Sequence, residues 1–485
     1  MSKTIEVDVA IIGAGSAGLS AHRAVKRQHM SALMIDPGPH GTTCARTGCM
    51  PSKLLIAAAE AAHDMHRASR FGVRAGHIEI DGQAVMKRVQ DERDRFVGFV
   101  EETIDEAIEQ GELIEGRALI AGERELDVTM RDGSKVRVEF DRLVLAVGSR
   151  PFIPSPFRVL SSPVLITSEE IFEFDDLPES MLVIGLGVIG LELGQAMHRL
   201  GVRTTLLGMG GGLGPLHDAE LLDEAKRIFK AELDIHPDYD FKGIEMLPDG
   251  AGVRIEFVDS EGRERSETYE RVLMAAGRRS NLDRVGLEHI DVHPDDSGGW
   301  GIHQGTLQLR ELPIYVAGDA NGLHPLLHEA TDDGKIAGRN AARHPEPLAP
   351  RRRVKLSIMF TDPQIAIIGH HDARFHGKDL AVGKIDYGRQ GRARVMGVNR
   401  GLFKVYGNDD GLLLGGEFLG PRAEHMSHLL AWAIQSGLTV DKALSMPFYH
   451  PVFEEGFRTA LRHLSSEIKH RAKLEDRVAE LGVGS

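Results

Sequence analysis

Two glycine-rich turns constrain the fold of this chain more than any other feature, because each connects a short apolar strand to a helix. The first strand is expected at Val7–Ile12, a helical pattern follows to about Gln28, and Ala32–Asp36 is the next strand. A short apolar run with β-branched residues, bounded by glycine, is typical of a buried parallel strand. The sequence therefore predicts a βαβ unit at its amino-terminal end.

The same arrangement recurs near the middle of the chain, with strands at Met181–Ile184 and Arg203–Leu207 on either side of a helix at Ile189–Leu200. Two such units predict two doubly wound α/β domains. The length of 485 residues suffices for roughly two to four domains. Prolines between 151 and 163, and again between 345 and 350, mark the expected linkers between domains. A separate α+β domain is expected after the second linker.

The first turn has the residues that a dinucleotide-binding turn requires. Gly13 allows the tight turn, Gly15 lets the backbone approach a pyrophosphate, and Gly18 lets helix and strand pack closely. The helix beginning near Ser16 offers free N–H groups and partial positive charge to phosphates. Asp36, at the end of the next strand, can accept a hydrogen bond from a ribose hydroxyl. A turn without a ligand is the alternative, which the register of strand, helix and acid disfavours.

The second turn repeats this pattern but lacks the acid. Its residues are Gly185, Gly187, Val188, Ile189 and Gly190. The next strand ends at Leu207, and the expected acidic position is Gly208, within a glycine-rich run to Gly214. Losing that carboxylate would cost about 1–3 kcal/mol of cofactor binding. No arginine is placed for a 2′-phosphate, so NAD is favoured and NADP stays open. The run itself is expected to be a flexible loop rather than a phosphate cradle.

Charge and cysteine content exclude several classes of protein. With 58 basic and 72 acidic side chains, the net charge of −14 provides no basic field for nucleic acid or an anionic membrane. No apolar run approaches the roughly 20 residues that span a bilayer. The amino-terminal segment lacks the apolar region of a signal peptide, so a cytoplasmic location is expected. Only two cysteines occur, which excludes a disulfide scaffold and a four-cysteine zinc site; no metal site is predicted.

Both cysteines lie in the segment CARTGCMPSK at positions 44–53, at an expected junction of loop and helix. Cys44 and Cys49 could reach the Cα separation of a disulfide if the turn is distorted. In a reducing compartment such a pair is more often catalytic than structural. Helix N–H groups and nearby Lys53 or Arg46 would favour a thiolate. Two unrelated buried cysteines are the alternative, which the flanking residues disfavour.

This segment resembles the signature GGxCxxxGCxPSK of the class I pyridine nucleotide–disulfide oxidoreductases, and the resemblance covers nearly the whole chain. Other matching segments are LAVGSRP at 145–151, AAGRR at 275–279, YVAGD at 315–319, LHEA at 327–330, FTDPQIA at 360–366 and HPVFEE at 450–455. The resemblance implies two doubly wound, Rossmann-like domains that bind FAD and NAD, plus a carboxy-terminal α+β dimerisation domain. The implied divisions are an FAD-binding part at 1–152, an NAD(P)-binding domain at 153–275, a second FAD-binding and central part at 276–349, and the dimerisation domain at 350–485.

The resemblance also implies which residues would contact the cofactors. Those implied for FAD are Gly13, Gly15, Ser16, Gly18, Asp36, Lys53, Gly148, Asp319 and Ala330. Those implied for NAD are Gly185, Gly187, Val188, Ile189, Gly190, Glu192 and Gly277. The nicotinamide would stack on the flavin face opposite the disulfide.

The catalytic roles follow from the same resemblance. Cys44 would be the interchange thiol that exchanges with substrate sulfur, and Cys49 the flavin-side thiol that forms the charge-transfer complex. Lys53 would lie near flavin N5 and pair with Glu192.

A homodimer is implied as well, because His450 of the partner subunit would shuttle the proton while Glu455 holds its imidazole. Thiol–disulfide exchange needs a thiolate attacker and a protonated leaving thiol, so a base that titrates near neutral pH suits it.

At the position of Ser52, in the PSK part of the signature, this sequence resembles lipoamide dehydrogenases and mercuric reductases more than glutathione reductases, which usually carry a second lysine there. Mercuric reductases also use a carboxy-terminal cysteine pair, and this chain has no cysteine after Cys49. The implied function is FAD-dependent oxidation of dihydrolipoamide by NAD⁺ in a 2-oxo acid dehydrogenase or glycine cleavage complex. Its partner would be a lipoylated protein or a small dithiol or disulfide.

Two alternatives stay open. Thr43 in place of a usual glycine, Arg46 between the cysteines, and Gly208 favour an NAD(P)H-dependent reductase of another low-molecular-weight disulfide. The other alternative is a flavoprotein retained mainly as a binding subunit with weak diaphorase activity. The intact cysteines, Lys53 and the histidine–glutamate pair count against it.

Overall fold

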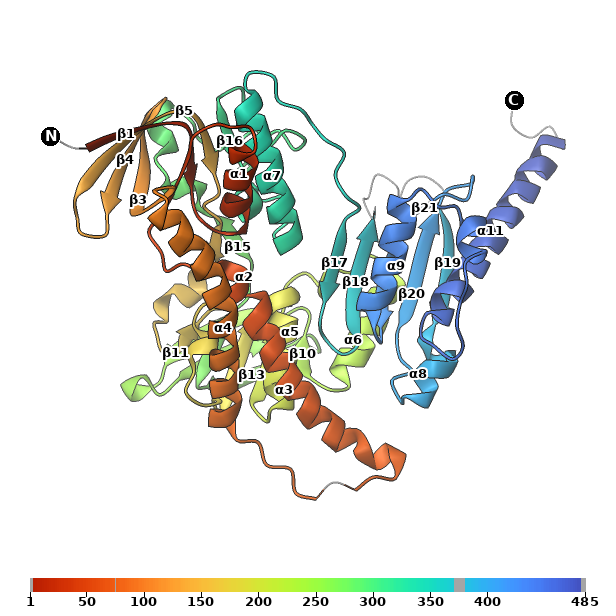
Figure 1. Ribbon diagram of the computed structural model, residues 1–485. Coiled ribbons are helices and arrows are strands. Elements are labelled where there is room, and N and C mark those ends of the chain that lie inside the picture. The colour runs from red at the N-terminus through yellow and green to blue at the C-terminus, as the bar shows by residue number, and fades with distance from the viewer. Residues whose placement is uncertain (1–2, 75, 370–379, 481–485) are drawn as a thin grey trace.

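The computed structural model describes residues 3–74, 76–369 and 380–480, which form the units shown in Figure 1. The first unit is built on a sheet in which β1 pairs in parallel with both β2 and β5. Its strands are β1 (Lys3–Ile12), β2 (Ala32–Asp36), β3 (Leu113–Gly122), β4 (Glu125–Met130), β5 (Lys135–Leu145) and β16 (Ile314–Val316). The predicted first βαβ unit is therefore present.

Helices cover one face of this sheet. They are α1 (Ser16–Lys26), α4 (Gly82–Glu109) and α7 (Leu327–Arg343), and their apolar side chains share one core with β1, β2 and β5. A second core fills the opposite face, where β3, β4 and β5 pack against short 3₁₀ segments at Asn281–Arg284 and Leu287–Ile290.

Helices α1 and α7 pack with almost no side chain between them. A Cβ atom on Gly334 of α7 would lie 2.2 Å from the carbonyl oxygen of Ala17. One on Gly338, a turn later, would lie 2.5 Å from the carbonyl oxygen of Ala21. Glycine at these two positions therefore sets how closely α7 approaches the nucleotide-binding helix α1.

The second unit contains the second predicted βαβ unit. Its parallel sheet has the order β10-β9-β8-β14-β7. The strands are β7 (Leu165–Ile166), β8 (Ser180–Ile184), β9 (Arg203–Leu207), β10 (Asp234–His236) and β14 (Arg271–Met274). Helices α5 (Val188–Arg199) and α6 (Ala219–Lys230) pack on the sheet, and an antiparallel ribbon packs over its apolar residues in a separate core. The ribbon strands are β11 (Asp240–Met246), β12 (Val253–Val258) and β13 (Glu264–Tyr269).

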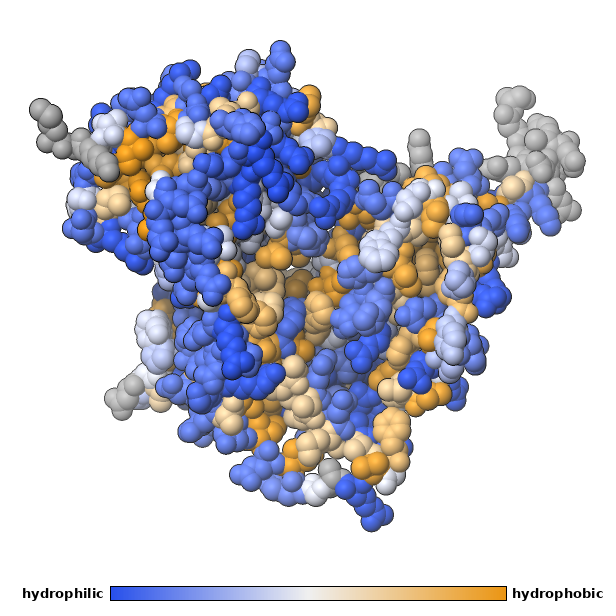
Figure 2. Space-filling model, viewed as in Figure 1, coloured by the Kyte–Doolittle hydropathy of each residue, from blue (hydrophilic) through white to orange (hydrophobic). Residues whose placement is uncertain are grey.

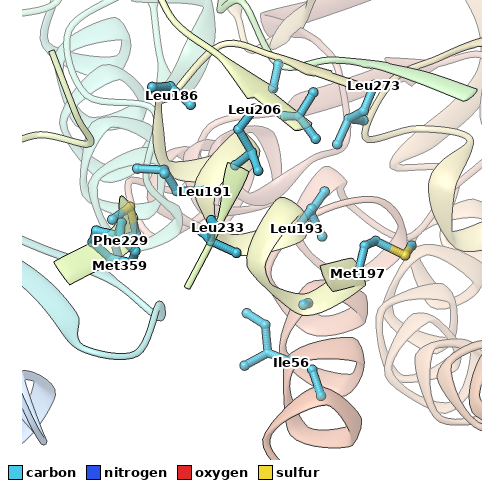
Figure 3. Close-up of a cluster of buried hydrophobic side chains, with 14 of the residues drawn as sticks. Ile56, Leu186, Leu191, Leu193, Met197, Leu206, Phe229, Leu233, Leu273 and Met359 are labelled. Carbon is cyan, nitrogen blue, oxygen red and sulfur yellow. The ribbon is translucent and has the colours of Figure 1, made fainter. Parts of the chain in front are cut away.

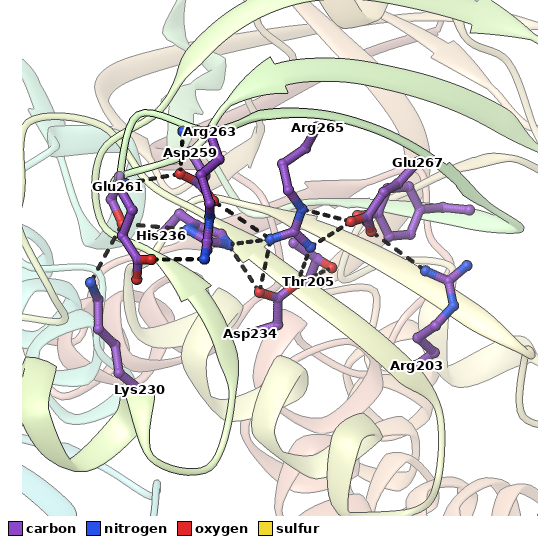
Figure 4. Close-up of polar contacts among 12 residues, drawn as sticks. Arg203, Thr205, Lys230, Asp234, His236, Asp259, Glu261, Arg263, Arg265 and Glu267 are labelled. Carbon is purple, nitrogen blue, oxygen red and sulfur yellow. Dashed lines mark hydrogen bonds and ion pairs between the residues drawn. The ribbon is translucent and has the colours of Figure 1, made fainter.

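Charged side chains tie the ribbon to the edge strand β10 (Figure 4). Arg265 of β13 donates from Nη2 to Asp234 Oδ2 at 2.9 Å and pairs with Glu267 on its own strand. Arg265 Nη1 also lies 3.2 Å from His236 Nε2, and that ring nitrogen lies 2.9 Å from Asp234 Oδ1 on the same strand. These contacts fix the end of β10 against the ribbon.

Two short antiparallel strands, β6 (Ser149–Pro151) and β15 (Arg278–Ser280), pair with each other where the chain passes between the first two units.

The third unit is an antiparallel sheet of order β17-β18-β21-β20-β19. Its elements are β17 (Leu356–Met359), β18 (Gln364–Gly369), β19 (Ala381–Asp386), α8 (Gly391–Val395), β20 (Leu402–Gly407), β21 (Leu413–Gly420), α9 (Ala423–Gln435), α10 (Val440–Leu444) and α11 (Glu455–Glu480). We propose the divisions 1–152, 153–275, 276–349 and 350–485 as the domains of the chain.

The three units meet around helix α3 (Cys49–Arg67), which follows the short helix α2 (Thr43–Arg46). Figure 3 shows Ile56 of α3 in one apolar cluster with Leu193 and Met197 of α5, and Met359 of β17 belongs to the same cluster. The surface is mainly hydrophilic in Figure 2, with apolar residues gathered where the units meet at the centre of that view. Among the described residues, no helix is both long and apolar enough to cross a membrane.

Replacing Gly334 with alanine is expected to lower the melting temperature of the FAD-loaded protein. The added methyl group would meet backbone of α1, and overpacking of this kind costs about 1–3 kcal/mol. Gly98 in α4 is the matched control, because a Cβ there would have no atom within 4 Å. Gly98→Ala should raise the melting temperature, since alanine exceeds glycine in helix propensity by about 1 kcal/mol. Equal stabilisation by both substitutions would contradict the close packing of α1 and α7.

Candidate active site

The first glycine turn has the geometry of a phosphate-binding turn. Gly13 has φ +104°, and a Cβ on it would lie 2.4 Å from the carbonyl oxygen of Ala146. A Cβ on Gly18 would lie 1.9 Å from the carbonyl oxygen of Gly13. Gly15, by contrast, has no atom within 4 Å of its Cβ position and caps the helix that begins at Ser16. The turn is closed on its inner side and open at the helix N-terminus, where a pyrophosphate can approach.

Asp36 lies beside this turn and is held there by backbone. Its Oδ2 accepts a hydrogen bond from the Ala14 N–H at 2.8 Å, and its Oδ1 accepts one from the Gly38 N–H at 2.8 Å. A carboxylate has about four acceptor positions, so each oxygen can still accept a further bond. The side chain is therefore oriented for a ribose hydroxyl.

A polar group farther along the first unit completes the candidate FAD site. Ser149 donates from Oγ to Asp319 Oδ2 at 3.1 Å, and Arg278 donates from Nε to Ser149 Oγ at 2.8 Å. Asp319 directly follows Gly318, where a Cβ would lie 3.0 Å from the Cβ of Ala17 and 3.3 Å from that of Ala330. The open turn, the ribose acceptor and this second acid fit a dinucleotide laid along the carboxyl ends of the parallel strands.

The glycines of the two linking strands have the backbone that their positions require. Gly148 has φ +64° and Gly277 has φ +113°, both in the left-handed region. They lie just before β6 and β15, so both turns bend the chain between the first two units.

The two cysteines are free thiols at the junction of α2 and α3. Cys44 is half-buried in α2, and Cys49 is exposed at the first position of α3. The pKa of Cys49 is lowered to about 7, chiefly by a hydrogen bond between the two thiols and also by the ammonium of Lys53, although burial acts in the opposite direction. The same hydrogen bond, followed by burial, raises the pKa of Cys44. Cys49 is therefore the residue of the pair that ionises near neutral pH.

The departure from the glycine signature lies at Thr42, not at Thr43 as the sequence interpretation placed it. Thr42 has φ +61° and ψ 148°, a region that β-branched residues rarely adopt and that glycine adopts freely. Its side chain accepts a hydrogen bond from the Ala45 N–H at 3.2 Å and so caps α2. Thr43 is the first helical residue and has no such constraint.

An ion pair joins α3 to α5. Lys53 Nζ lies 2.7 Å from Glu192 Oε2, and Glu192 is almost fully buried. The other carboxylate oxygen accepts a hydrogen bond from the Phe360 N–H at 2.8 Å. The Lys53 ammonium also lies 4.8 Å from the centre of the Phe360 ring. The predicted pairing is present, and Phe360, which the sequence interpretation did not assign to the site, contacts both partners.

The second turn repeats the geometry of the first. Gly185 has φ +110°, and a Cβ on Gly190 would lie 1.9 Å from the carbonyl oxygen of Gly185. Gly187 has no atom within 4 Å of its Cβ position and caps α5, which begins at Val188 and continues with Ile189. The run after β9 is anchored rather than loose: the N–H groups of residues 208, 211 and 214 donate to the carbonyl oxygens of residues 236, 237 and 186. The segment is a loop, as expected, and its backbone is hydrogen-bonded to its surroundings at these three positions.

His450 and Glu455 form the predicted pair at the start of α11. His450 Nδ1 lies 3.0 Å from both carboxylate oxygens of Glu455. Because a carboxylate only accepts, Nδ1 carries the proton and Nε2 is left to exchange protons with a substrate. The hydrogen bond from His450 lowers the pKa of Glu455. Within one chain the histidine side chain is 78% exposed, and the structure does not bring it to the cysteines.

Sequence reasoning missed two contributors to this site. Arg278 lies in the quoted segment AAGRR but had no assigned function, although it holds Ser149 beside Asp319. Phe360 begins the quoted segment FTDPQIA, yet its contact depends on a fold that brings residues 192 and 360 together. For both residues, the only feature of the sequence that could have indicated a role is membership of a segment that resembles a family motif.

Comparison with known proteins agrees with this geometry. Residues 7–334 match the family described as pyridine nucleotide-disulphide oxidoreductase, and residues 356–461 match the dimerisation domain of that family. A dihydrolipoyl dehydrogenase of Halobacterium salinarum is 29% identical over 96% of this chain and 97% of its own. A mercuric reductase of Streptomyces lividans is 30% identical over 95% of this chain and 97% of its own.

Two solved structures share the fold. LpdA of Mycobacterium tuberculosis has a TM-score of 0.79 and 24% identity, covering 94% of this chain and 100% of its own. The HOCl-induced flavoprotein disulfide reductase RclA of Escherichia coli, solved as a Cu(II) complex, has a TM-score of 0.78 and 19% identity over 97% and 99%. At these identities the likeness establishes the fold alone.

The predicted fold class is confirmed by these matches and by the two βαβ-containing sheets, one mixed and one parallel, with an added antiparallel unit. The protein is an enzyme of the flavoprotein disulfide oxidoreductase type, with FAD and NAD(H) as cofactors. The dimerisation domain supports a homodimer. The chain belongs to the pyridine nucleotide-disulphide oxidoreductase family.

Proposed function

We propose that this protein oxidises dihydrolipoamide with NAD⁺ through a disulfide between Cys44 and Cys49. One observation carries the proposal: Cys44 in α2 and Cys49 at the start of α3 share a hydrogen bond, and the pKa of Cys49 is lowered to about 7. The dihydrolipoyl dehydrogenases at 28–29% identity over 93–96% of the chain support this choice of substrate.

In the proposed dithiol half-reaction, one substrate sulfur attacks Cys44 as a thiolate. The bond between Cys44 and Cys49 breaks, and Cys49 leaves as a thiolate, which its low pKa favours. The second substrate sulfur then displaces Cys44 from the mixed disulfide. The substrate ends as a disulfide and the enzyme as a dithiol, so two electrons have passed to the cysteine pair.

Cys44 must be protonated as it leaves the mixed disulfide, because its pKa is raised, and the step therefore requires a group that carries a proton from the substrate thiol to Cys44. We assign this role to His450 of the partner subunit, since His450 is exposed in one chain and carries its proton on Nδ1 toward Glu455. Nε2 then accepts the proton from the attacking substrate thiol and returns one to the leaving thiolate of Cys44. Glu455 orients the ring and stabilises the imidazolium. The active unit of this proposal is a homodimer.

FAD would be held by the first turn, Asp36 and Asp319, and it supplies two-electron chemistry between a dithiol and a nicotinamide. Lys53 is the cation that acts on Cys49 and pairs with Glu192, which supports the proposal that it would lie near the flavin. Its pairing with Glu192 holds the ammonium in place, while the second turn and Gly277 would hold NAD. The proposed overall reaction is balanced: dihydrolipoamide and NAD⁺ give lipoamide, NADH and a proton.

A reductase of another low-molecular-weight disulfide is the second candidate, and Arg46 favours it. The Arg46 side chain is one-third exposed between the cysteines, and its nearest carboxylate oxygen, on Glu101, lies 3.9 Å away. Such a weakly held guanidinium could bind an anionic disulfide. A mercuric reductase is also among the relatives, but this sequence has no cysteine beyond Cys44 and Cys49 to receive a metal from a second thiol pair.

The partner of the reaction is then a lipoylated protein or free dihydrolipoamide. Two assays decide between the candidates: reduction of NAD⁺ by free dihydrolipoamide, and reduction of another low-molecular-weight disulfide by NAD(P)H. We further propose a cytoplasmic location, because a pair that cycles between dithiol and disulfide suits a compartment that keeps thiols reduced.

Cys49→Ser should leave FAD bound and abolish reduction of NAD⁺ by dihydrolipoamide, because the disulfide cannot form. Cys44→Ser should do the same. Oxidation of NADH by a one-electron acceptor such as ferricyanide is the control, since it bypasses the thiols and should persist in both variants. Wild-type lipoamide turnover by either variant would contradict the dithiol mechanism.

Alkylation of Cys49 in the reduced holoenzyme should increase with pH around a midpoint of about 7. The lowered pKa means that the thiolate is present above this pH and is protonated below it. Lys53→Met should raise the midpoint by about one pH unit, because removal of a nearby opposite charge disfavours the thiolate. Lys53→Arg keeps the charge beside Glu192 and should leave the midpoint within a few tenths of wild type. An unchanged midpoint in Lys53→Met would show that Lys53 does not act on Cys49.

His450→Ala should slow the dithiol half-reaction by about 10²–10⁴-fold, the usual contribution of general acid–base catalysis. Reduction of the flavin by NADH should change little, and rapid mixing resolves the two half-reactions. The matched control is His293→Ala, which removes another exposed histidine beside an acid, Asp291 at 3.4 Å. Equal slowing of both half-reactions would contradict the proton-transfer role.

A further inference from the structure

We propose that the second nucleotide site binds NADPH as well as NADH, because glycine occupies the position of the ribose-binding acid and a lysine that pairs with none of the described residues lies beside the adjoining loop. The inference depends only on the second turn being the nicotinamide nucleotide site. It holds whichever disulfide the enzyme acts on.

Gly208 and Leu186 explain why the acid is absent. An acidic side chain directly after the second strand of such a unit normally accepts the ribose hydroxyls and repels a 2′-phosphate. A Cβ on Gly208 would lie 2.6 Å from Leu186 Cδ1 and 2.7 Å from Leu186 Cγ. The backbone of Gly208 lies outside the left-handed region, so packing rather than conformation opposes a larger residue: Leu186, which is 6% exposed, is the main obstacle, and the Pro237 carbonyl oxygen would lie 3.2 Å from the added Cβ. An apolar side chain thus fills the space where the carboxylate would begin.

The loop after Gly208 has a defined path over this region. Gly208 N–H donates to the His236 carbonyl oxygen at 2.8 Å, and Gly214 N–H donates to the Leu186 carbonyl oxygen at 2.7 Å. Gly211 N–H donates to the Pro237 carbonyl oxygen at 3.1 Å. Two of these bonds are made to His236 at the end of β10 and to Pro237 directly after it, and Arg265 of the ribbon contacts this strand at Asp234 and His236 (Figure 4). The residues that flank the loop therefore keep constant positions.

Lys226 of α6 is the cation at this loop. A Cβ on Gly211 would lie 3.8 Å from Lys226 Nζ. Within the described parts of the chain, no hydrogen bond or ion pair engages this ammonium, whereas the next residue, Arg227, is paired with Glu224. A lysine ammonium binds phosphate as a point charge. It is therefore available to a 2′-phosphate that extends over the glycine run.

One carboxylate also contacts the loop and limits any preference for NADPH over NADH. Asp238 is exposed, and its Oδ1 accepts a hydrogen bond from the Gly210 N–H at 3.3 Å. It can accept from a ribose hydroxyl and it opposes the field of Lys226. With one charge of each sign at the loop, we expect binding of both nucleotides rather than selection of one.

The test is direct binding of NADH and of NADPH to the FAD-loaded protein, measured by equilibrium dialysis at one fixed ionic strength. The two dissociation constants should differ by less than about tenfold in the wild type. Lys226→Met should weaken NADPH binding about fivefold and leave NADH binding within a factor of about two. Lys230→Met, one turn later on the same helix, is the matched control and should change neither constant.

The double variant Leu186→Ala/Gly208→Glu restores an acid in the space that Leu186 vacates. It should weaken NADPH binding by about tenfold or more relative to wild type and retain NADH binding.

A wild-type protein that binds NADPH more than about tenfold more weakly than NADH would overturn the proposal. So would a Lys226→Met variant that weakens both nucleotides equally, or neither. These outcomes are separate from the proposed lipoamide activity, because nucleotide binding is measured without any dithiol.

Discussion

The ion pair between Lys53 and Glu192 is the interaction on which the arrangement of this active site depends. Lys53 comes from the cysteine-bearing helix α3, Glu192 from α5 of the second unit, and Phe360, whose N–H binds the free carboxylate oxygen, from the third. A buried carboxylate is tolerated only when it is paired and hydrogen-bonded, so removing one of these donors would leave a costly charge in the interior. One contact thereby aligns three units around the point where electrons must pass.

Helix α3 combines this alignment with the chemistry. Its first residue is Cys49, Lys53 follows one turn later, and Ile56 then enters the apolar core shared with α5 and β17. The thiolate, its nearby cation and the packing that holds both are therefore carried on one rigid element. This explains how an exposed thiol can keep a defined relation to a nucleotide site built on a separate βαβ unit. It also explains why the backbone just before the pair tolerates an unfavourable conformation at Thr42.

The parts of this account that could be predicted from sequence are local in the chain. Gly13, Gly18 and Asp36 belong to one βαβ unit, so their spacing alone indicates a turn and an acceptor. The pairing of Lys53 with Glu192 came instead from the resemblance to a family. Neither source indicated Phe360, nor the fit of Leu186 against Gly208, because these contacts are made by segments distant in sequence. The proximity of Lys226 to Gly211 is likewise a contact between a helix and a loop whose path no residue pattern specifies.

The most direct test of the central claim is anaerobic addition of one equivalent of dihydrolipoamide per chain to the oxidised, FAD-loaded protein, followed by acid quenching, alkylation and peptide mapping. The account predicts two newly alkylated residues per chain, Cys44 and Cys49, which are the two cysteines of the sequence. It also predicts that neither is alkylated before the dithiol is added. Reaction of dihydrolipoamide without the appearance of these two thiols, or with only one of them, would contradict a disulfide that carries the electrons.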